Sequence, residues 1–379
     1  MLFNKILTSK TVSLAALVAI ALGSTAYATQ YTVTPLGTLG GASTTVTGIN
    51  STGELVGFSY NSAGNYNAFL YSNGAMTNLT PGGSFSDAEG INSAGQVVGS
   101  AVFTSGSAQN AFLYSNGTMT NLGTFGGASS GANGINSSGQ VVGWATTSAG
   151  NTNAFLYSNG AMTNLGTLGG TFSQAFGINS SGQVVGGATN SAGYFNAFLY
   201  SNGTMTNLGT TGGVASDVAS EAIGINSTGQ VVGLADNSAG NQNAFLYSNG
   251  TMRNLGTLGG TYSQANGINS SGQVVGYSTN SAGNYNAFLY SNGGMQNLNS
   301  LIGSASSEYT LIYAAGINKN GQIAAEGTIT ATGQSMGFLL TPVASTSSAG
   351  VPAPATLGLL AAAMAGFLVM RRKRVSVLG

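Results

Sequence analysis

The phrase NAFLYSNG occurs six times in the chain, and this repetition constrains the fold more than any other feature. Its copies begin at Asn67, Asn110, Asn153, Asn196, Asn243 and Asn286, at intervals of 43, 43, 43, 47 and 43 residues. The phrase Gly-Ile-Asn occurs seven times, beginning at Gly48, Gly90, Gly134, Gly177, Gly224, Gly267 and Gly316. LGTLGG or a variant begins at Leu36, Leu79, Leu122, Leu165, Leu208, Leu255 and Leu298. Periods of about 20–50 residues indicate a solenoid, a propeller or an array.

Each repeat predicts four short strands. In one copy they are SQAFGIN, QVVGGAT, NAFLYS and MTNLG. The Asn-Gly pair between the last two, as at Asn159-Gly160, favours a tight hairpin because both residues tolerate a positive φ. The phrases AFLY and QVV are apolar on both faces of a strand, so both faces are expected to be covered. Four strands in about 43 residues is the size of a propeller blade.

The first and last repeats are incomplete in complementary ways. The segment QYTVTPLGTLGG near residue 30 resembles the last strand of a repeat, whereas the final repeat stops after GFLLTP without that strand. A closed ring would use the early strand to complete the last blade and remove an exposed edge. We therefore expect an all-β, seven-bladed β-propeller of four-stranded repeats over residues 29–344, closed by its N-terminal strand. The alternatives are a β-solenoid and an open array.

The first 28 residues predict a signal peptide. Lys5 and Lys10 precede an apolar run, and Ala26-Tyr27-Ala28 ends the segment as a small-x-small cleavage site. Signal peptidase would cut after Ala28. The alternative is an uncleaved N-terminal anchor, although the apolar run is short for a bilayer.

The C-terminal residues form a three-part pattern after a linker at 345–350. The parts are the motif Val351, Pro352, Ala353 and Pro354, an apolar segment at 355–370, and the basic residues Arg371, Arg372, Lys373 and Arg374. Basic residues after an apolar helix are retained in the cytoplasm, so we expect a transmembrane helix at 355–370. The helix would contact the membrane at least transiently. An unprocessed anchor is the alternative to a processed signal.

Residues 351–379 resemble the PEP-CTERM sorting signal of Gram-negative bacteria, with Ala353 in place of the glutamate of that motif. The resemblance implies recognition by an exosortase and cleavage near the proline motif. It also implies export through an inner-membrane intermediate to the cell surface or extracellular matrix. The repeats at about 35–340 resemble the extracellular HAF-repeat family, with asparagine replacing histidine in each copy. That resemblance implies an extracellular repeat protein and carries no catalytic residue with it.

The composition excludes several kinds of chemistry. The chain has no histidine and no cysteine, so thiolate catalysis, Ser-His-Asp triads and the common zinc sites are absent. Charged residues make up 4% of the chain, and Arg253 and Lys319 are the only basic residues between 29 and 350. Nucleic-acid binding requires clustered basic residues, so it is not expected.

We expect no cofactor and no metal site that recurs in each repeat, because the acidic residues fall at different positions in the repeats. They are Glu54, Asp87, Glu89, Asp217, Glu221, Asp236, Glu308 and Glu326. Calcium shared by Asp87 and Glu89, or by Asp217 and Glu221, is an alternative to solvated loop charges. An extracellular enzyme with one site on non-repeated loops, such as VASDVASEA at 214–222, is the alternative function.

Six tyrosines beside the Asn-Gly turns are candidate ligand-facing residues: Tyr71, Tyr114, Tyr157, Tyr200, Tyr247 and Tyr290. Aromatic rings beside amides suit sugars, and the alternative role for these rings is packing between blades. With no catalytic set, we expect a structural or adhesive surface protein rather than an enzyme. Its expected partners are extracellular matrix polysaccharide or proteins.

Overall fold

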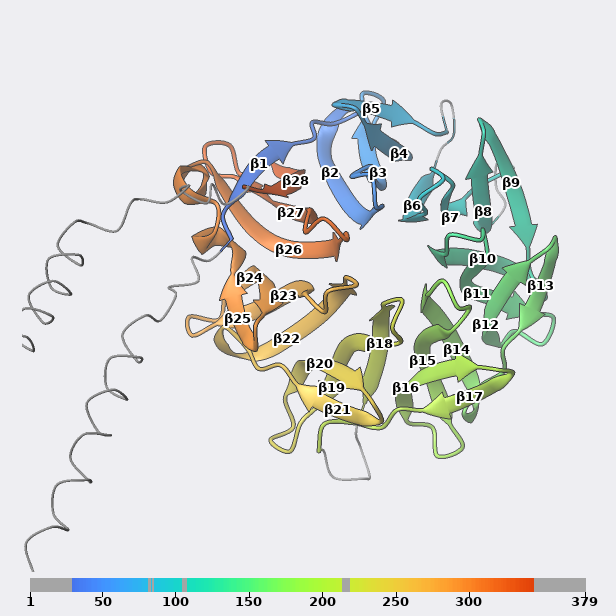
Figure 1. Cartoon of the computed structure of the whole chain (residues 1–379). Coiled ribbons are helices and arrows are strands. Elements are labelled where there is room, and N and C mark those ends of the chain that lie inside the picture. The colour runs from blue at the N-terminus through green and yellow to red at the C-terminus, as the bar shows by residue number, and fades with distance from the viewer. Residues whose placement is uncertain (1–28, 81–82, 84, 104–107, 213–218, 344–379) are drawn as a thin grey trace, which may run out of the picture. The chain divides into compact units, whose positions relative to one another are not determined.

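The described residues form a ring of antiparallel β-sheets in the computed structural model (Figure 1). The structure describes residues 29–80, 83, 85–103, 108–212 and 219–343. Seven repeat units follow one another around the ring, each with four strands numbered outward from the centre. The first strands of neighbouring units contact one another, so they surround the centre.

The first four units follow the chain in order. Unit 1 contains β2 (Gly40–Ile49), β3 (Leu55–Asn61), β4 (Tyr66–Ser72) and β5 (Ala75–Asn78). Unit 2 contains β6 (Ser86–Ile91), β7 (Val97–Ala101), β8 (Asn110–Ser115) and β9 (Thr118–Gly123). Unit 3 contains β10 (Gly126–Ile135), β11 (Val141–Thr147), β12 (Thr152–Ser158) and β13 (Ala161–Asn164). Unit 4 contains β14 (Gly169–Ile178), β15 (Val184–Asn190), β16 (Phe195–Ser201) and β17 (Thr204–Asn207).

The last three units complete the ring. Unit 5 contains β18 (Ser220–Ile225), β19 (Val231–Asp236), β20 (Gln242–Ser248) and β21 (Thr251–Asn254). Unit 6 contains β22 (Gly259–Ile268), β23 (Val274–Asn280), β24 (Tyr285–Ser291) and β25 (Gly294–Asn297). The 3-10 helices η1 (Leu298–Ser300) and η2 (Gly303–Ser307) lead to unit 7, which contains β26 (Tyr309–Ile317), β27 (Ile323–Ile329), β28 (Ser335–Pro342) and β1 (Tyr31–Pro35).

The N-terminal strand closes the ring. β1 pairs antiparallel with β28, with Tyr31 opposite Pro342 and Pro35 opposite Phe338. The Tyr31 N–H donates to the Leu301 carbonyl at 2.9 Å, and its side chain is buried in the core of unit 7. The pairing of first and last strands predicted from the incomplete repeats is therefore confirmed.

The prediction of seven separate four-stranded blades is wrong. Five four-stranded sheets stand alone, whereas units 3 and 4 form one eight-stranded sheet from β10 to β17. β14 begins early, at Gly169, so Phe172 lies within the strand and pairs in parallel with Thr152 of β12. At the corresponding junction between units 1 and 2, Phe85 precedes β6 and makes only an isolated bridge with Tyr66.

The predicted transmembrane helix at 355–370 is also not part of the observed fold. That segment lies outside the described residues. Within the described part of the chain, no helix is long and apolar enough to cross a membrane. The corrected fold is an all-β propeller whose described residues include strands and two short 3-10 helices.

The apolar phrases of the repeat form the core between neighbouring units. Phe69 and its equivalents in the other five NAFLYSNG copies are fully buried. One cluster joins Val56 and Ala68 of unit 1 to Val97 and Phe112 of unit 2, and similar clusters recur around the ring. Both faces of each sheet are therefore covered, as the sequence predicted.

The Asn-Gly turns have the backbone that the hairpin requires. The six asparagines have φ values of 50° to 53°, and they are Asn73, Asn116, Asn159, Asn202, Asn249 and Asn292. Such φ values are uncommon outside glycine but accessible to asparagine. The following glycines also have positive φ, which matches a type I′ turn.

The Gly-Ile-Asn phrase forms a closed circle of hydrogen bonds. The amide Nδ2 of Asn136 donates to the backbone carbonyl of Asn179 in the next unit at 3.1 Å. The corresponding asparagine of every unit makes the same bond to its neighbour, and Asn318 completes the circle by donating to Asn50 at 3.0 Å. Each of these side chains is buried at 4–5% exposure. The Gly-Ile-Asn phrase thus joins the units into one ring.

Candidate functional site

The ring has two ends with opposite character. Antiparallel pairing brings the Gly-Ile-Asn turns and the Asn-Gly hairpins to one end, which we call the GIN face. The same pairing brings the connections between second and third strands, such as that between Tyr60 and Tyr66, to the other end. We call this end the variable face, because the first and second strands that lead to it carry side chains that differ from unit to unit.

One cross-strand pair in each unit illustrates this variation. At a single register position of the first and second strands, the seven pairs are Thr45 with Phe58, Asp87 with Ser100, Gly131 with Trp144, Gln174 with Gly187, Glu221 with Leu234, Gln264 with Tyr277 and Tyr313 with Glu326. No two pairs are alike, although the adjoining Gly-Ile-Asn phrase is identical in all units. A single site for a ligand is therefore more readily built on the variable face.

Units 6 and 7 bring four tyrosines together there, and we call Tyr262, Tyr277, Tyr285 and Tyr313 the tyrosine cluster. The ring centroids of Tyr277 and Tyr313 are 4.5 Å apart. Tyr285 and Tyr313 stack at 6.4 Å with 21° between their planes. Their exposed fractions are 44% and 37%, respectively. The cluster thus presents two parallel aromatic rings to solvent.

A hydrogen-bond network fixes the less exposed half of the tyrosine cluster. The hydroxyls of Tyr262 and Tyr277 each donate to Gln264 Oε1 at 3.0 Å. Gln264 Nε2 donates to Asn266 Oδ1 at 2.9 Å, and Asn266 Nδ2 donates to the Ala314 carbonyl at 3.0 Å. The network links β22 to β26 of the next unit. Burial raises the pKa of the Tyr277 phenol, so it remains a neutral donor.

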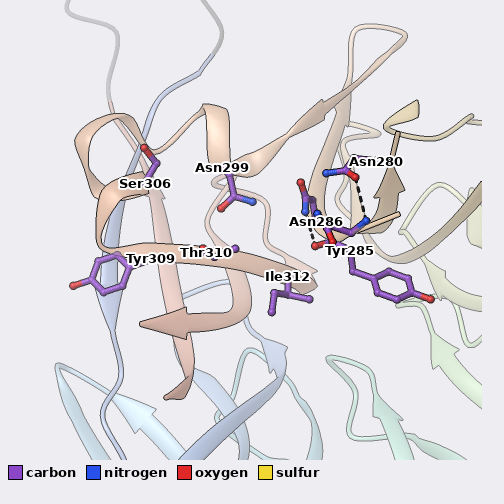
Figure 2. A pocket seen from close by; sticks show the side chains of 9 residues that line it. Asn280, Tyr285, Asn286, Asn299, Ser306, Tyr309, Thr310 and Ile312 are labelled. Atoms are coloured by element: carbon purple, nitrogen blue, oxygen red, sulfur yellow. Dashed lines mark hydrogen bonds between the residues drawn. The ribbon is translucent and has the colours of Figure 1, made fainter. Parts of the chain in front are cut away.

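A pocket of about 600 Å³ adjoins the tyrosine cluster (Figure 2). Its lining is Asn280, Asn284, Tyr285, Asn286, Asn299, Ser306, Tyr309, Thr310 and Ile312. Figure 2 shows Asn280, Tyr285 and Asn286 on one side and Ser306, Tyr309 and Thr310 on the other. Tyr285 belongs to both the pocket and the cluster, so the two adjoin, and the pocket lining contains no charged residue.

The pocket depends on a change in the repeat at η1 and η2. There the chain replaces the usual LGTLGG link with LNSLIGSASSE, residues 298–308. Leu298, Leu301 and Ile302 are buried, which anchors the apolar side of this segment in the core. The side-chain amide of Asn299 makes two hydrogen bonds to β26. Its Oδ1 accepts from Leu311 N at 2.8 Å, and its Nδ2 donates to Leu311 O at 2.9 Å. The polar side of the segment forms the pocket wall.

Three carboxylates lie near the same end of the ring, at Asp87, Glu89 and Glu326. Burial, followed by repulsion from Asp87 and Glu326, raises the pKa of Glu89 to about 8. Burial raises the pKa of Glu326 to about 7, while a hydrogen bond from the Val46 N–H to Glu326 Oε1 at 3.1 Å opposes the shift. Asp87 Oδ1 accepts from Ser100 N and Oγ at 2.9 and 2.6 Å. Within the described ranges, no group of three or more acidic residues is arranged to hold a metal ion.

The candidate tyrosines predicted from the sequence lie at the GIN face. Tyr71 and Tyr290 are 7% and 6% exposed. The others, Tyr114, Tyr157, Tyr200 and Tyr247, are partly buried against the clusters between units. Arg253 lies over the Tyr290 ring at 5.9 Å, and the Tyr290 hydroxyl has no hydrogen-bond partner. Ligand contact by these six tyrosines stays a prediction.

Other predicted site residues fall outside the described residues. These are the signal-cleavage residues Ala26 and Ala28, the motif at 351–354 and the basic residues at 371–374. In the segment 214–222, Asp217 lies outside the described residues, and Glu221 lies on β18 at the variable face. The structure therefore leaves their roles as predictions.

Sequence reasoning missed the tyrosine cluster. Its members come from four different positions within a repeat, so none of them recurs regularly. The available signal was the variation between repeats, because the residue at the position of Tyr277 differs in every unit and is Phe58 in unit 1 and Ser100 in unit 2.

Comparison with known proteins gives only distant similarities. No protein-family model and no curated protein matches the chain. TolB from Acinetobacter baumannii is similar at 13% identity and a TM-score of 0.37, with 65% of each chain covered. Pyrococcus horikoshii acylaminoacyl peptidase is similar at 11% identity and a TM-score of 0.45, with 75% of this chain and 50% of that chain covered. A six-bladed Aleuria aurantia lectin is similar at 11% identity and a TM-score of 0.35, with 71% and 94% covered. Fewer than two thirds of the residues of the first two proteins are matched, and none of these similarities assigns a function to this chain.

Proposed function

We propose that this propeller binds neutral polysaccharide outside the cell, through the tyrosine cluster and the adjoining pocket. The observation that carries the proposal is the exposed, stacked pair Tyr285 and Tyr313 beside a pocket lined by amides and hydroxyls. The apolar faces of sugar rings pack on aromatic rings, and their hydroxyl groups exchange hydrogen bonds with side-chain amides. Concave sites with a few convergent polar groups are the usual sites for small ligands.

The export route in this proposal rests on the sequence of the two ends. The basic, apolar and small-x-small order of residues 1–28 supports cleavage by signal peptidase. The resemblance of residues 351–379 to a sorting signal supports recognition by an exosortase and delivery to the cell surface of a Gram-negative bacterium. The mass of the mature protein from its own cell tests both steps. A chain that retains Met1 or Gly379 would contradict the corresponding step.

The binding test uses the full chain and soluble neutral polysaccharides, namely a β-1,3-glucan, a β-1,4-glucan and a galactomannan. We expect retention of the protein in an affinity gel that contains at least one of them. A single site should bind at about 0.1–1 mM. Tyr285→Ala should weaken binding roughly tenfold, since an aromatic contact contributes about 1 kcal/mol or more.

The matched control is Phe195→Ala. Phe195 is the first residue of the third strand in unit 4, as Tyr285 is in unit 6, but it lies away from the pocket. It should leave binding unchanged. Equal losses in both variants, or no retention by any polysaccharide, would contradict the proposal. Hydrolysis of a retained polysaccharide would instead support the alternative of an extracellular enzyme.

A further inference from the structure

The exposed aromatic side chains gather on one arc of the variable face. Among the described residues, the large hydrophobic side chains that are exposed are Tyr60, Phe103, Tyr285, Tyr313 and Val343, at 37–48%. Tyr60 belongs to unit 1, Phe103 follows β7 of unit 2, and the other two tyrosines belong to units 6 and 7. These four units are consecutive around the closed ring. Solvent-exposed aromatic residues concentrated in this way are characteristic of an interaction surface.

Unit 1 holds an aromatic cluster of its own, formed by Phe58, Tyr60, Tyr66 and Phe85. We call it the unit 1 cluster. Tyr66 lies at its centre, with ring centroids 5.0 Å from Phe58, 5.8 Å from Tyr60 and 4.4 Å from Phe85. Phe85 comes from the chain entering unit 2. The cluster is therefore built across a junction between units, as the tyrosine cluster is across units 6 and 7.

The strands of unit 7 connect the two clusters. Tyr313, a member of the tyrosine cluster, is directly opposite Glu326 on β27. Glu326 Oε1 accepts from the backbone N–H of Val46 on β2 of unit 1. The side chains of Tyr66 and Asp87 are also close enough to interact electrostatically. These contacts place β27 of unit 7, which pairs with the strand of Tyr313, against β2 of unit 1, so the units that carry the two clusters adjoin one another.

Building on the proposed function, we infer that the ligand is an extended polymer whose chain occupies both clusters at once. The tyrosine cluster and its pocket hold one stretch of sugars, and the unit 1 cluster holds another. Once the first stretch is bound, the second is held at a high effective concentration near its subsite. Affinity should therefore increase with chain length until the ligand reaches both clusters.

A length series tests this inference. Fragments of two, four, six and eight sugars are cut from the retained polysaccharide and titrated against the full chain. Tyr60→Ala is the informative variant, because Tyr60 is 39% exposed and contacts only one ring of its cluster, so its removal should leave the fold intact. We expect wild-type affinity to rise at least tenfold from two to eight sugars. Tyr60→Ala should lose about fivefold or more for eight sugars and nothing for two.

The Tyr285→Ala variant and the Phe195→Ala control make the outcomes separable. Tyr285→Ala should weaken the binding of short and long fragments alike, whereas Phe195→Ala should affect neither. If affinity is the same for all lengths and Tyr60→Ala has no effect, the two-cluster inference is wrong while the proposed function stands. If wild-type protein retains no polysaccharide, the proposed function itself fails.

Discussion

Glu89 is an acidic residue in a ring that is otherwise nearly uncharged. It occupies the position two residues before isoleucine in Gly-Ile-Asn, where the equivalent residues of units 1 and 3 are Thr47 and Asn133. Its carboxyl is crowded by Asp87 and Glu326, and burial together with this repulsion raises its pKa to about 8. The neutral form of Glu89 is therefore favoured in the folded protein near pH 7.

This shift makes the stability of the ring depend on pH. The folded protein keeps a proton on Glu89 that the unfolded chain releases near pH 4.5, so stability is greatest below that pH and is lost as the pH rises through about 8. We expect wild-type protein to be less stable at pH 9 than at pH 5. Glu89→Gln should reduce this difference by about 1–3 kcal/mol, a range that allows for solvent screening. Urea unfolding at both pH values measures it.

The control for this prediction is Glu308→Gln, because Glu308 is an exposed carboxylate just before β26. It should leave the pH dependence as it is in the wild type. Glu326 adds a shift in the same direction, with a pKa of about 7, so some pH dependence should survive in Glu89→Gln. An unchanged difference between pH 5 and pH 9 in Glu89→Gln would show that Glu89 is ionised in the folded protein.

At the scale of elements, the strand β1 determines whether the ring is closed. Without it, β28 would expose the backbone of residues 338–342, with which β1 now pairs. An exposed strand edge is a template for pairing with another chain. The contacts of β1 also cover the apolar residues of unit 7, including Leu340 and Phe338. β1 therefore protects an edge and completes a core at the same time.

Deletion of residues 29–35 should lower the thermal unfolding temperature markedly and promote aggregation. The reason is that both the edge pairing and the burial of Tyr31 are lost. Reattaching the same residues after Pro342 through an Asn-Gly turn is the matched rescue, because Tyr31 and Pro342 are already paired. The rescued chain should recover most of the lost stability. Thermal unfolding of the deletion variant at the wild-type temperature would refute a closing role for β1.

The elements show why some features were predictable and others were not. The Asn-Gly turns, the buried AFLY strands and the pairing of β1 with β28 follow from local chemistry that recurs in each repeat. The joining of units 3 and 4 into one sheet depends on a single parallel pair, Thr152 with Phe172, whereas the equivalent Tyr66 and Phe85 make only an isolated bridge. The tyrosine cluster required knowing that residues 262, 277, 285 and 313 meet across two units. That meeting depends on the three-dimensional ring and not on the spacing within a repeat.

At the scale of the whole molecule, the two faces of the ring have different tasks. The GIN face repeats one hydrogen-bonded arrangement in every unit, and its buried asparagines hold the units together. The side chains of the variable face can differ from unit to unit, because they take no part in the circle of hydrogen bonds between the asparagines. Identical residues thus explain the scaffold, and the differences between repeats explain where a ligand site arises.

The charge distribution of the variable face leads to a prediction about salt. The pocket and the tyrosine cluster contain amides, hydroxyls and phenols, and the nearby Glu89 is largely protonated near pH 7. Binding that relies on these groups involves few ion pairs, so screening by salt should have little effect. We expect the dissociation constant of the retained polysaccharide to change less than twofold between 50 and 500 mM NaCl at pH 7. An acidic polysaccharide such as alginate should not compete, because neither the pocket lining nor the tyrosine cluster contains a basic residue to pair with its carboxylates. A steep salt dependence, or effective competition by alginate, would mean that charged groups carry the recognition and that the neutral-polymer proposal is mistaken.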